Sequence, residues 1–384
     1  MPNDYIYLDH AAATPLDERV LDAMTPYFSE KFFNPSSPYL PAVVVRREYE
    51  NAKSVIAGCI GAKSDELVMT AGATESINLM FHSISGHVVT TAVEHAAVLE
   101  AAARHDHTIV EVDHTGTVSL DALRHAITDE TTLVSVGLAN NEIGTIQKIR
   151  DIAEIIKDIR HQRRDRASQT PLYLHSDASQ GLGLIDIHVA RLGVDALTLN
   201  AAKVYGPKQI GLLWVSRDVR LTPILFGGGQ ERGLRSGTEN VAGVVGFARA
   251  IELASQHRKS ENERLTKLRD ILEHRLVEAF PAAVVSGNPK RRLPSHLHMS
   301  FPSIDGERIV FALESKGLYV ATGSACAANK GTRSHVLTAI GLESTIADGS
   351  IRMTLGRLSD DSTIERAADI IIETIDAEYK RSGQ

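Results

Sequence analysis

Residues 87–138 read HVVTTAVEHAAVLEAAARHDHTIVEVDHTGTVSLDALRHAITDETTLVSVGL, and this stretch decides the fold. Short apolar runs rich in β-branched residues, at His87–Thr91, Thr108–Val112 and Thr132–Leu138, predict strands. Between them, His95–Arg104 and Ser119–Ile127 have a helical pattern. Strands that alternate with helices predict crossover connections, and therefore an α/β fold with a mostly parallel sheet and helices on both faces.

The same alternation extends along the chain in both directions and brings the number of candidate strands to seven. The additional elements are the strands Leu67–Thr70, Leu172–Ser176, Ala196–Leu199 and Ile210–Val215 and the helices Glu75–Ser83, Ile149–Arg160 and Val189–Leu192. In such sheets ligands bind outside the carboxyl ends of the strands. We therefore expect the functional residues in the loops that follow these strands.

The pattern changes after residue 240. A long helical stretch from Val241 to about Phe280 is followed by shorter strands, His296–Phe301 and Ser350–Leu355, which predict a smaller α+β domain. We expect residues 15–255 to form the large domain and residues 1–14 with 256–384 to form the small one. The basic run Arg160–Arg166 lies between a helix and a strand and is predicted to be a solvated loop.

Composition excludes several classes of protein. The chain has 384 residues, of which 43% are hydrophobic and 23% charged, as in ordinary globular proteins. Its net charge of −7 argues against broad nucleic-acid binding. No apolar run is long enough to span a membrane, and the first residues lack the pattern of a secretion signal. With only two cysteines, a reducing cytoplasmic location is the simplest expectation.

Thr70–Ser76 follows a predicted strand and opens a predicted helix. Its small residues Ala71, Gly72 and Ala73 would let a ligand approach the backbone, and the N–H groups at a helix start attract phosphate. The alternative is a plain helix start with Thr74 as its cap.

Two residues after other strands carry reactive groups. Asp177 ends the strand Leu172–Ser176 and would place a carboxylate in the crevice, although it could simply cap the next helix. Lys203 follows Ala196–Leu199 and could form a Schiff base with a carbonyl compound, although alone it would be a surface lysine in a turn.

The order of these three features favours pyridoxal 5'-phosphate as the cofactor. Its phosphate needs N–H donors, its pyridine nitrogen needs an acid, and its aldehyde needs an amine. His95 could lay its ring over the cofactor, and Asn140–Gly144 supplies amides at another strand end. Cys326, among small residues, is a candidate nucleophile, whereas Cys59 is predicted to be a small buried residue.

The assembled pattern resembles the cysteine desulfurases of the class V aminotransferase family, which have the pyridoxal-phosphate fold type I. The resemblance runs nearly end to end, and its glycine-rich and cysteine-containing markers are together highly specific. The markers are YLDHAA at 7–12, NPSS at 34–37, GATES at 72–76, EH at 94–95, NNEIG at 140–144, DASQ at 177–180, KVYGPK at 203–208, GGGQERGLRSGT at 227–238, GSAC at 323–326 and SIRMTLGR at 350–357.

The resemblance implies a role for each matching residue. Lys203 would bond the cofactor aldehyde, Asp177 the pyridine nitrogen and Gln180 the phenolic oxygen, and the ring of His95 would stack on the cofactor ring. The phosphate would be held by Ala73, Thr74 and Asn200. Thr238 would also reach the phosphate, from the partner chain of a homodimer. Asn141 would contact the cofactor and, together with Arg352, would bind the substrate carboxylate. No metal site is expected.

The implied reaction converts L-cysteine to L-alanine. Lys203 would remove the Cα proton, His95 would help to move protons, and Cys326 would attack the substrate sulfur and become a persulfide. The sulfur would then pass to an acceptor protein, such as an iron–sulfur scaffold, or into thiolation pathways. The competing hypotheses are a selenocysteine lyase or cysteine sulfinate desulfinase, and a weakly active paralogue that serves as a sulfur carrier or assembly partner.

The chain departs from the family pattern at the cofactor site. Asn200 and Ala202 replace the usual serine and histidine, which are phosphate ligands in the family. A lost hydrogen bond to a charged group is worth about 1.5–3 kcal/mol, so we expect weaker cofactor binding. Tyr39 and Gln209 stand at positions where the family usually has histidine and glycine.

Overall fold

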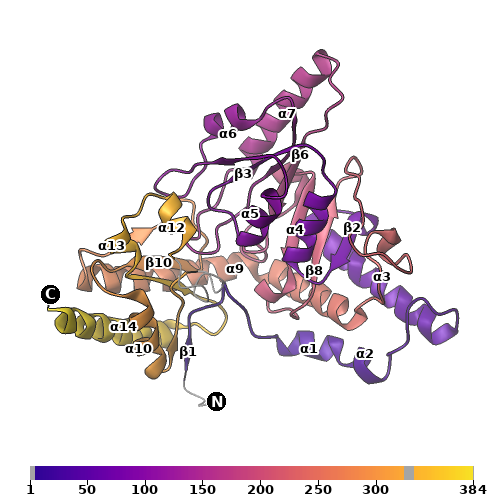
Figure 1. Ribbon diagram of the computed structural model, residues 1–384. Helices are drawn as coiled ribbons and strands as arrows, with labels where there is room; N and C mark the ends of the chain where they lie inside the picture. Colours follow the sequence, from indigo (N-terminus) through magenta and orange to yellow (C-terminus); the bar gives the residue numbers. More distant parts are fainter. Residues whose placement is uncertain (1–4, 324–332, 384) are drawn as a thin grey trace.

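The computed structural model describes residues 5–323 and 333–383. A seven-stranded sheet forms its centre (Figure 1). In spatial order the strands are β2 (Leu67–Thr70), β8 (Gly211–Val215), β7 (Ala196–Asn200), β6 (Tyr173–Asp177), β5 (Thr131–Ser135), β3 (His87–Thr91) and β4 (His107–Val110). β8 runs in the direction opposite to the other six strands, and the remaining pairs are parallel, which confirms the predicted mostly parallel sheet.

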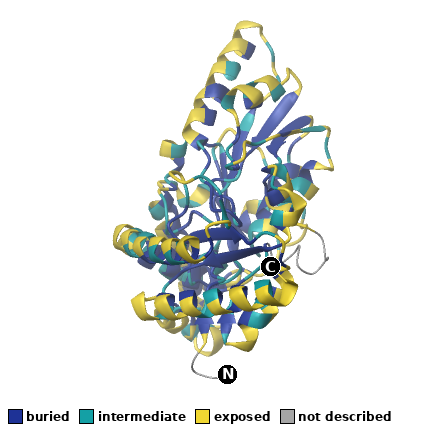
Figure 2. Cartoon of the chain, turned by 90° about the vertical axis from the view of Figure 1, so that its left-hand side faces the viewer, coloured by how far each residue is buried: buried dark blue, intermediate teal, exposed yellow. Residues whose placement is uncertain are grey.

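Helices cover both faces of this sheet. All its strands except the edge strand β4 are largely buried, while the outer sides of the helices are exposed (Figure 2). Burial on both faces explains why the strands are continuous apolar runs. The helices are α1 (Glu18–Met24), α2 (Pro26–Ser29), α3 (Leu40–Ile60), α4 (Ala73–His82), α5 (Ala96–Ala102), α6 (Leu120–Ala126), α7 (Ile149–Asp165), α8 (Val189–Leu192), α9 (Val241–Ala279), α10 (Gly306–Ser315), α12 (His335–Ala339), α13 (Ser344–Ala347) and α14 (Asp361–Ser382). Among the described residues, no helix is long and apolar enough to cross a membrane.

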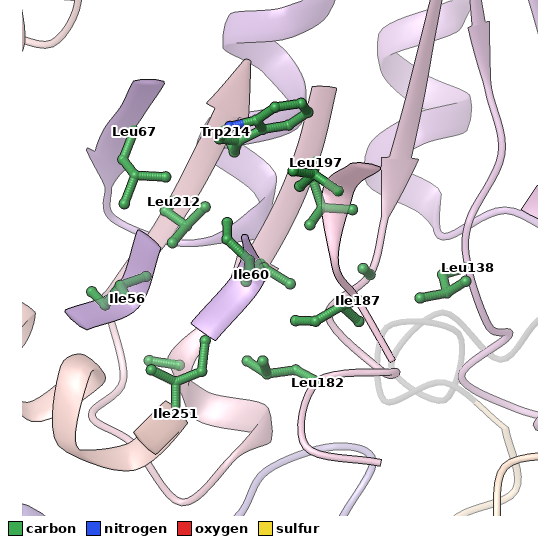
Figure 3. Packing of buried hydrophobic residues seen from close by; sticks show 14 of the residues in the cluster. Ile56, Ile60, Leu67, Leu138, Leu182, Ile187, Leu197, Leu212, Trp214 and Ile251 are labelled. Carbon is green, nitrogen blue, oxygen red and sulfur yellow. The ribbon is translucent and has the colours of Figure 1, made fainter. Parts of the chain in front are cut away.

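The main core lies between the central sheet and α3, α7 and α9. Figure 3 shows Ile56 and Ile60 of α3 close to Leu212 of β8 and Leu197 of β7. Trp214 packs in the same cluster and donates its indole N–H to Glu66 at 3.1 Å. Packing against these helices fixes the strands, and therefore also fixes the position of their carboxyl ends around the site described next.

A second core forms around a small antiparallel sheet of β12 (Ser350–Thr354), β10 (His296–Ser300) and β9 (Val284–Ser286). The 39-residue helix α9 contributes to both cores: its first half packs on the large sheet and its second half on the small one. The two-stranded sheet of β1 (Ile6–Tyr7) and β11 (Leu318–Tyr319) joins the start of the chain to the second core. The boundary near residue 255 stays a prediction.

The predicted loop at Arg160–Arg166 is wrong, although most of this run is exposed to solvent as expected. Helix α7 continues through Asp165, because this run contains no helix breaker. Arg163 is only 4% exposed, and its guanidinium donates to the carbonyl oxygens of Thr128, Thr131, Thr170 and Pro171. The charge at this position therefore ties the end of α7 to the sheet instead of facing water.

Candidate active site

A cavity of about 320 Å³ lies at the carboxyl ends of β3, β5, β6 and β7. Its wall brings together residues that are far apart in the sequence and that follow different strands. The predicted site residues in this wall are Ala73, Thr74, His95, Asn141, Asp177, Gln180, Asn200, Lys203 and Arg352.

Lys203 ends a short 3₁₀ turn, Ala201–Lys203, directly after β7. The side chain of Asn200 caps this turn by accepting the N–H of Ala202 at 3.1 Å. The Lys203 Nζ donates to the carbonyl oxygens of Ala11 and Ala12, both at 2.7 Å. The N-terminal segment therefore holds the amine in the wall of the cavity.

Asp177 is the last residue of β6. Its Oδ1 accepts the N–H of Ser179 at 2.9 Å, which fixes the carboxylate at the strand end, facing the cavity. Gln180 lies in the same turn and donates its Nε2 to the carbonyl oxygen of Ala11 at 3.1 Å. A carboxylate in this position can accept a hydrogen bond from the N–H group of a ligand ring and stabilise the positive charge of that protonated ring.

The cavity wall also contains the start of α4. Gly72 occupies the N-cap position with a φ of 145°, and no described side chain caps the helix. The alternative in which Thr74 caps this helix is therefore wrong. Ala73 and Thr74 form the first turn, whose N–H groups carry the partial positive charge of the helix N-terminus. Their place in the cavity wall suits an anion.

His95 caps α5 from the opposite wall. Its Nδ1 accepts the N–H of Ala97 at 3.1 Å, so the neutral ring carries its proton on Nε2. Desolvation by the surrounding protein lowers the pKa of His95, and the nearby Asp177 charge opposes this shift. The neutral ring can therefore donate one proton into the cavity.

Arg352 comes from β12 of the small sheet and is 1% exposed. Its Nη2 pairs with Asp9 Oδ1 at 2.5 Å, and its Nη1 donates to the carbonyl oxygen of Asn141 at 3.2 Å. Asn140 shapes the loop around Asn141 by accepting the N–H groups of Glu142 and Ile143. The guanidinium is thus fixed in direction at the cavity wall, which suits a carboxylate ligand.

Among the described residues, one predicted site residue, Thr238, is not brought into this cavity. Thr238 is exposed and lines a different cavity, together with Tyr49 and Glu231. Cys326 lies outside the described residues. The other cysteine, Cys59, is half-buried, and burial raises the pKa of its thiol.

Sequence reasoning missed the roles of Glu94 and of the carbonyl groups of Ala11 and Ala12, although all three stood in quoted markers. Glu94 is 5% exposed and accepts hydrogen bonds from Thr91 Oγ1 at 2.6 Å and from the N–H of Gly137 at 2.9 Å. Only the assembled fold places these groups beside Lys203.

The donor set of this cavity fits pyridoxal 5'-phosphate. An uncapped helix start suits the phosphate, Asp177 suits the pyridine nitrogen, and Lys203 suits the aldehyde. These three groups come from separate elements and face one cavity. The fit therefore rests on their arrangement and not on one residue alone.

Comparison with known proteins agrees with this geometry. Residues 6–366 match the family model "Aminotransferase class-V". The cysteine desulfurase IscS of Methanosarcina thermophila is 38% identical over 385 residues, which cover 97% of this chain and 92% of the relative. A solved NifS-like protein superposes with a TM-score of 0.89 at 33% identity, covering 97% of this chain and all of that one. A structure of SspA in complex with cysteine gives a TM-score of 0.76 at 32% identity, covering 91% of this chain and 98% of that one.

Proposed function

Because this chain is a cysteine desulfurase that belongs to the class V aminotransferase family, whose members depend on pyridoxal phosphate, we propose that the cavity around Lys203 holds pyridoxal 5'-phosphate. The observation that carries the proposal is the meeting of Lys203, Asp177 and the uncapped start of α4 in one wall. Ala73, Thr74 and Asn200 would hold the phosphate. When bound, the cofactor supplies an aldehyde that bonds amines and a ring that accepts electrons.

The side chains around the cavity would then divide the work on L-cysteine. Arg352 and Asn141 bind the substrate carboxylate, since the guanidinium is already fixed by Asp9. Lys203 takes the Cα proton, and His95, with its proton on Nε2, donates into the cavity. The similar protein SspA has been solved in complex with cysteine, which supports cysteine as the ligand of this chain.

Cys326 would complete the reaction. Its thiolate attacks the sulfur of the substrate, so that an S–S bond forms while the C–S bond breaks. The electron pair of the C–S bond remains with carbon and takes up a proton, which gives L-alanine and a persulfide on Cys326. A sulfur acceptor, such as an iron–sulfur scaffold protein, then takes the terminal sulfur. This chemistry needs a free thiol and therefore suits the reducing cytoplasm.

We also propose that the chain works as a homodimer. Large apolar side chains on α1 to α3 and their loops are exposed, including Phe28 at 65%, Phe32 at 67% and Leu40 at 75%. Phe226, in a separate loop, is 83% exposed. Exposed apolar surface of this kind marks an interaction site. A second copy of the chain would cover it and would bring its Thr238 toward the cofactor phosphate.

Replacing the lysine tests this proposal. Wild-type protein supplied with pyridoxal phosphate should show the visible absorbance of lysine-bound cofactor and release alanine from L-cysteine. Lys203→Ala should lose both. Lys208→Ala is the matched control, because its Nζ contacts the carbonyl oxygen of Thr14 at 3.4 Å and it does not line the cavity. A Lys203→Ala protein that keeps both signals would refute the proposal.

A further inference from the structure

Three donors make four hydrogen bonds to the buried carboxylate of Glu231. The Tyr49 hydroxyl donates to Oε1 at 2.5 Å, and the Lys53 Nζ contacts Oε2 at 3.0 Å and Oε1 at 3.2 Å. The N–H of Met69 in β2 donates to Oε2 at 2.9 Å. Tyr49, Lys53 and Glu231 are 1%, 4% and 8% exposed. We call these three side chains, with the Met69 N–H group, the Glu231 clamp.

Burying this clamp costs the protein folding stability. Burying an ion pair is no more stabilising than well-packed apolar side chains of the same size, because both charges lose their water. The backbone is also strained at this point, since Glu231 and Arg232 both have a positive φ, at 45° and 60°. Strain maintained by surrounding contacts is a sign that the local shape serves a function.

The clamp attaches a glycine-rich segment to α3 and β2. Residues 227–238 contain five glycines, Gly227, Gly228, Gly229, Gly233 and Gly237, and glycine-rich chain loses much entropy when it is ordered. A second attachment is the ion pair of Arg235 with Glu75 at 2.9 Å, on the first turn of α4. The segment ends at the exposed Thr238, seven positions after Glu231.

We propose that Glu231 is a positioning residue that acts on the cofactor of the partner chain. By fixing residues 227–238 against α3 and β2, the Glu231 clamp holds Thr238 in the place from which it reaches the phosphate bound by the other subunit. This inference rests on the proposed homodimer and cofactor. It predicts that damage to the clamp of one chain weakens cofactor binding in the site of the partner chain, and not in the site of the damaged chain.

Mixed dimers with a single lysine-bearing site test this direction. In the trans arrangement, a chain with Lys203→Ala and Glu231→Gln is paired with a wild-type chain. In the cis arrangement, a Lys203→Ala chain is paired with a Glu231→Gln chain. The readout is the rate at which the visible absorbance of lysine-bound cofactor decays when the loaded mixed dimer is dialysed against cofactor-free buffer, so that released cofactor is removed.

We expect cofactor release about tenfold faster in the trans arrangement, the size of one lost charge-assisted hydrogen bond, and an unchanged rate in the cis arrangement. Equal rates in the two arrangements, or faster release in cis alone, would overturn the inference. If the wild-type chain neither dimerises nor binds the cofactor, the proposed function fails instead, so the two failures are distinguishable.

Glu48→Gln is the matched control. Glu48 lies on α3, as Tyr49 and Lys53 do, and it also accepts hydrogen bonds from a tyrosine and a lysine. These are Tyr27 at 2.9 Å and Lys31 at 2.6 Å, and neither lies in residues 227–238. It should leave the release rate unchanged in both arrangements. If Glu231→Gln does not assemble, because Lys53 is left without its buried counter-charge, the double variant Glu231→Gln/Lys53→Met removes both charges and takes its place.

Discussion

Glu94 shows how the fold sets the chemistry of a single residue. Its buried carboxyl group lies in the same cavity wall as Asp177 and Lys203. Burial raises the pKa of Glu94 to about 7, and the negative charge of Asp177 adds to the shift, although hydrogen bonds from Thr91 and Gly137 oppose it. The group therefore changes charge near neutral pH, next to residues that must move protons.

Glu94→Gln should remove a pH dependence of stability. The folded pKa of about 7 is higher than the ordinary value of 4.5, so the protonated form stabilises the fold below pH 4.5, and this contribution is lost as the pH rises through 7. Relative to the variant, wild-type protein should lose about 3 kcal/mol of unfolding free energy between pH 4.5 and pH 8. Urea unfolding of both cofactor-free proteins measures this difference, and the same difference at both pH values would contradict the assignment.

At the scale of elements, the turn that we propose to hold the phosphate depends on how closely β8 approaches the start of α4. A Cβ atom on Gly211 of β8 would lie 2.7 Å from the Cα of Gly72 and 2.7 Å from the carbonyl oxygen of Leu199. Both neighbours are backbone atoms, which cannot move aside as a flexible side chain can. The contact between Gly211 and Gly72 therefore sets how closely the start of α4 lies against β8.

Gly211→Ala should therefore weaken both the fold and the cofactor site. We expect a loss of about 1–3 kcal/mol in unfolding free energy from overpacking, with weaker binding of pyridoxal phosphate because Gly72 is displaced. Gly58→Ala in α3 is the control: nothing lies within 4 Å of its added Cβ atom, so it should be neutral or stabilising by up to about 1 kcal/mol. Thermal unfolding and cofactor titration measure the two effects; unchanged cofactor affinity in Gly211→Ala would contradict this account.

At the scale of the whole molecule, local pattern predicts the elements and long-range contact decides the site. Each of the seven predicted strands is present, and all but the edge strand β4 are apolar runs that are largely buried on both faces. The contact of Lys203 with Ala11 joins positions 192 residues apart, and no local pattern contains it. The burial of Arg163, the one buried residue of the run Arg160–Arg166, likewise depends on carbonyl groups of other segments, which the local charge pattern does not contain.

The candidate site was predictable to the extent that its residues follow strands. Asp177 and Lys203 do so, and the carboxyl ends of neighbouring strands meet at one edge of a sheet. The place of Thr238 could not be predicted in this way, because in one chain it lies outside the Lys203 cavity and its proposed role needs a second chain. The family resemblance supplied that expectation, and the mixed dimers test it.

The central claim is that sulfur leaves L-cysteine and arrives on Cys326 in a protein whose Lys203 holds the cofactor. Mass spectrometry of the intact holoenzyme after treatment with L-cysteine tests it most directly. Wild-type protein and Cys59→Ser should each gain sulfur on Cys326, whereas Cys326→Ser should gain none. Sulfur found on Cys59, or alanine released with no sulfur on either cysteine during turnover, would contradict the account.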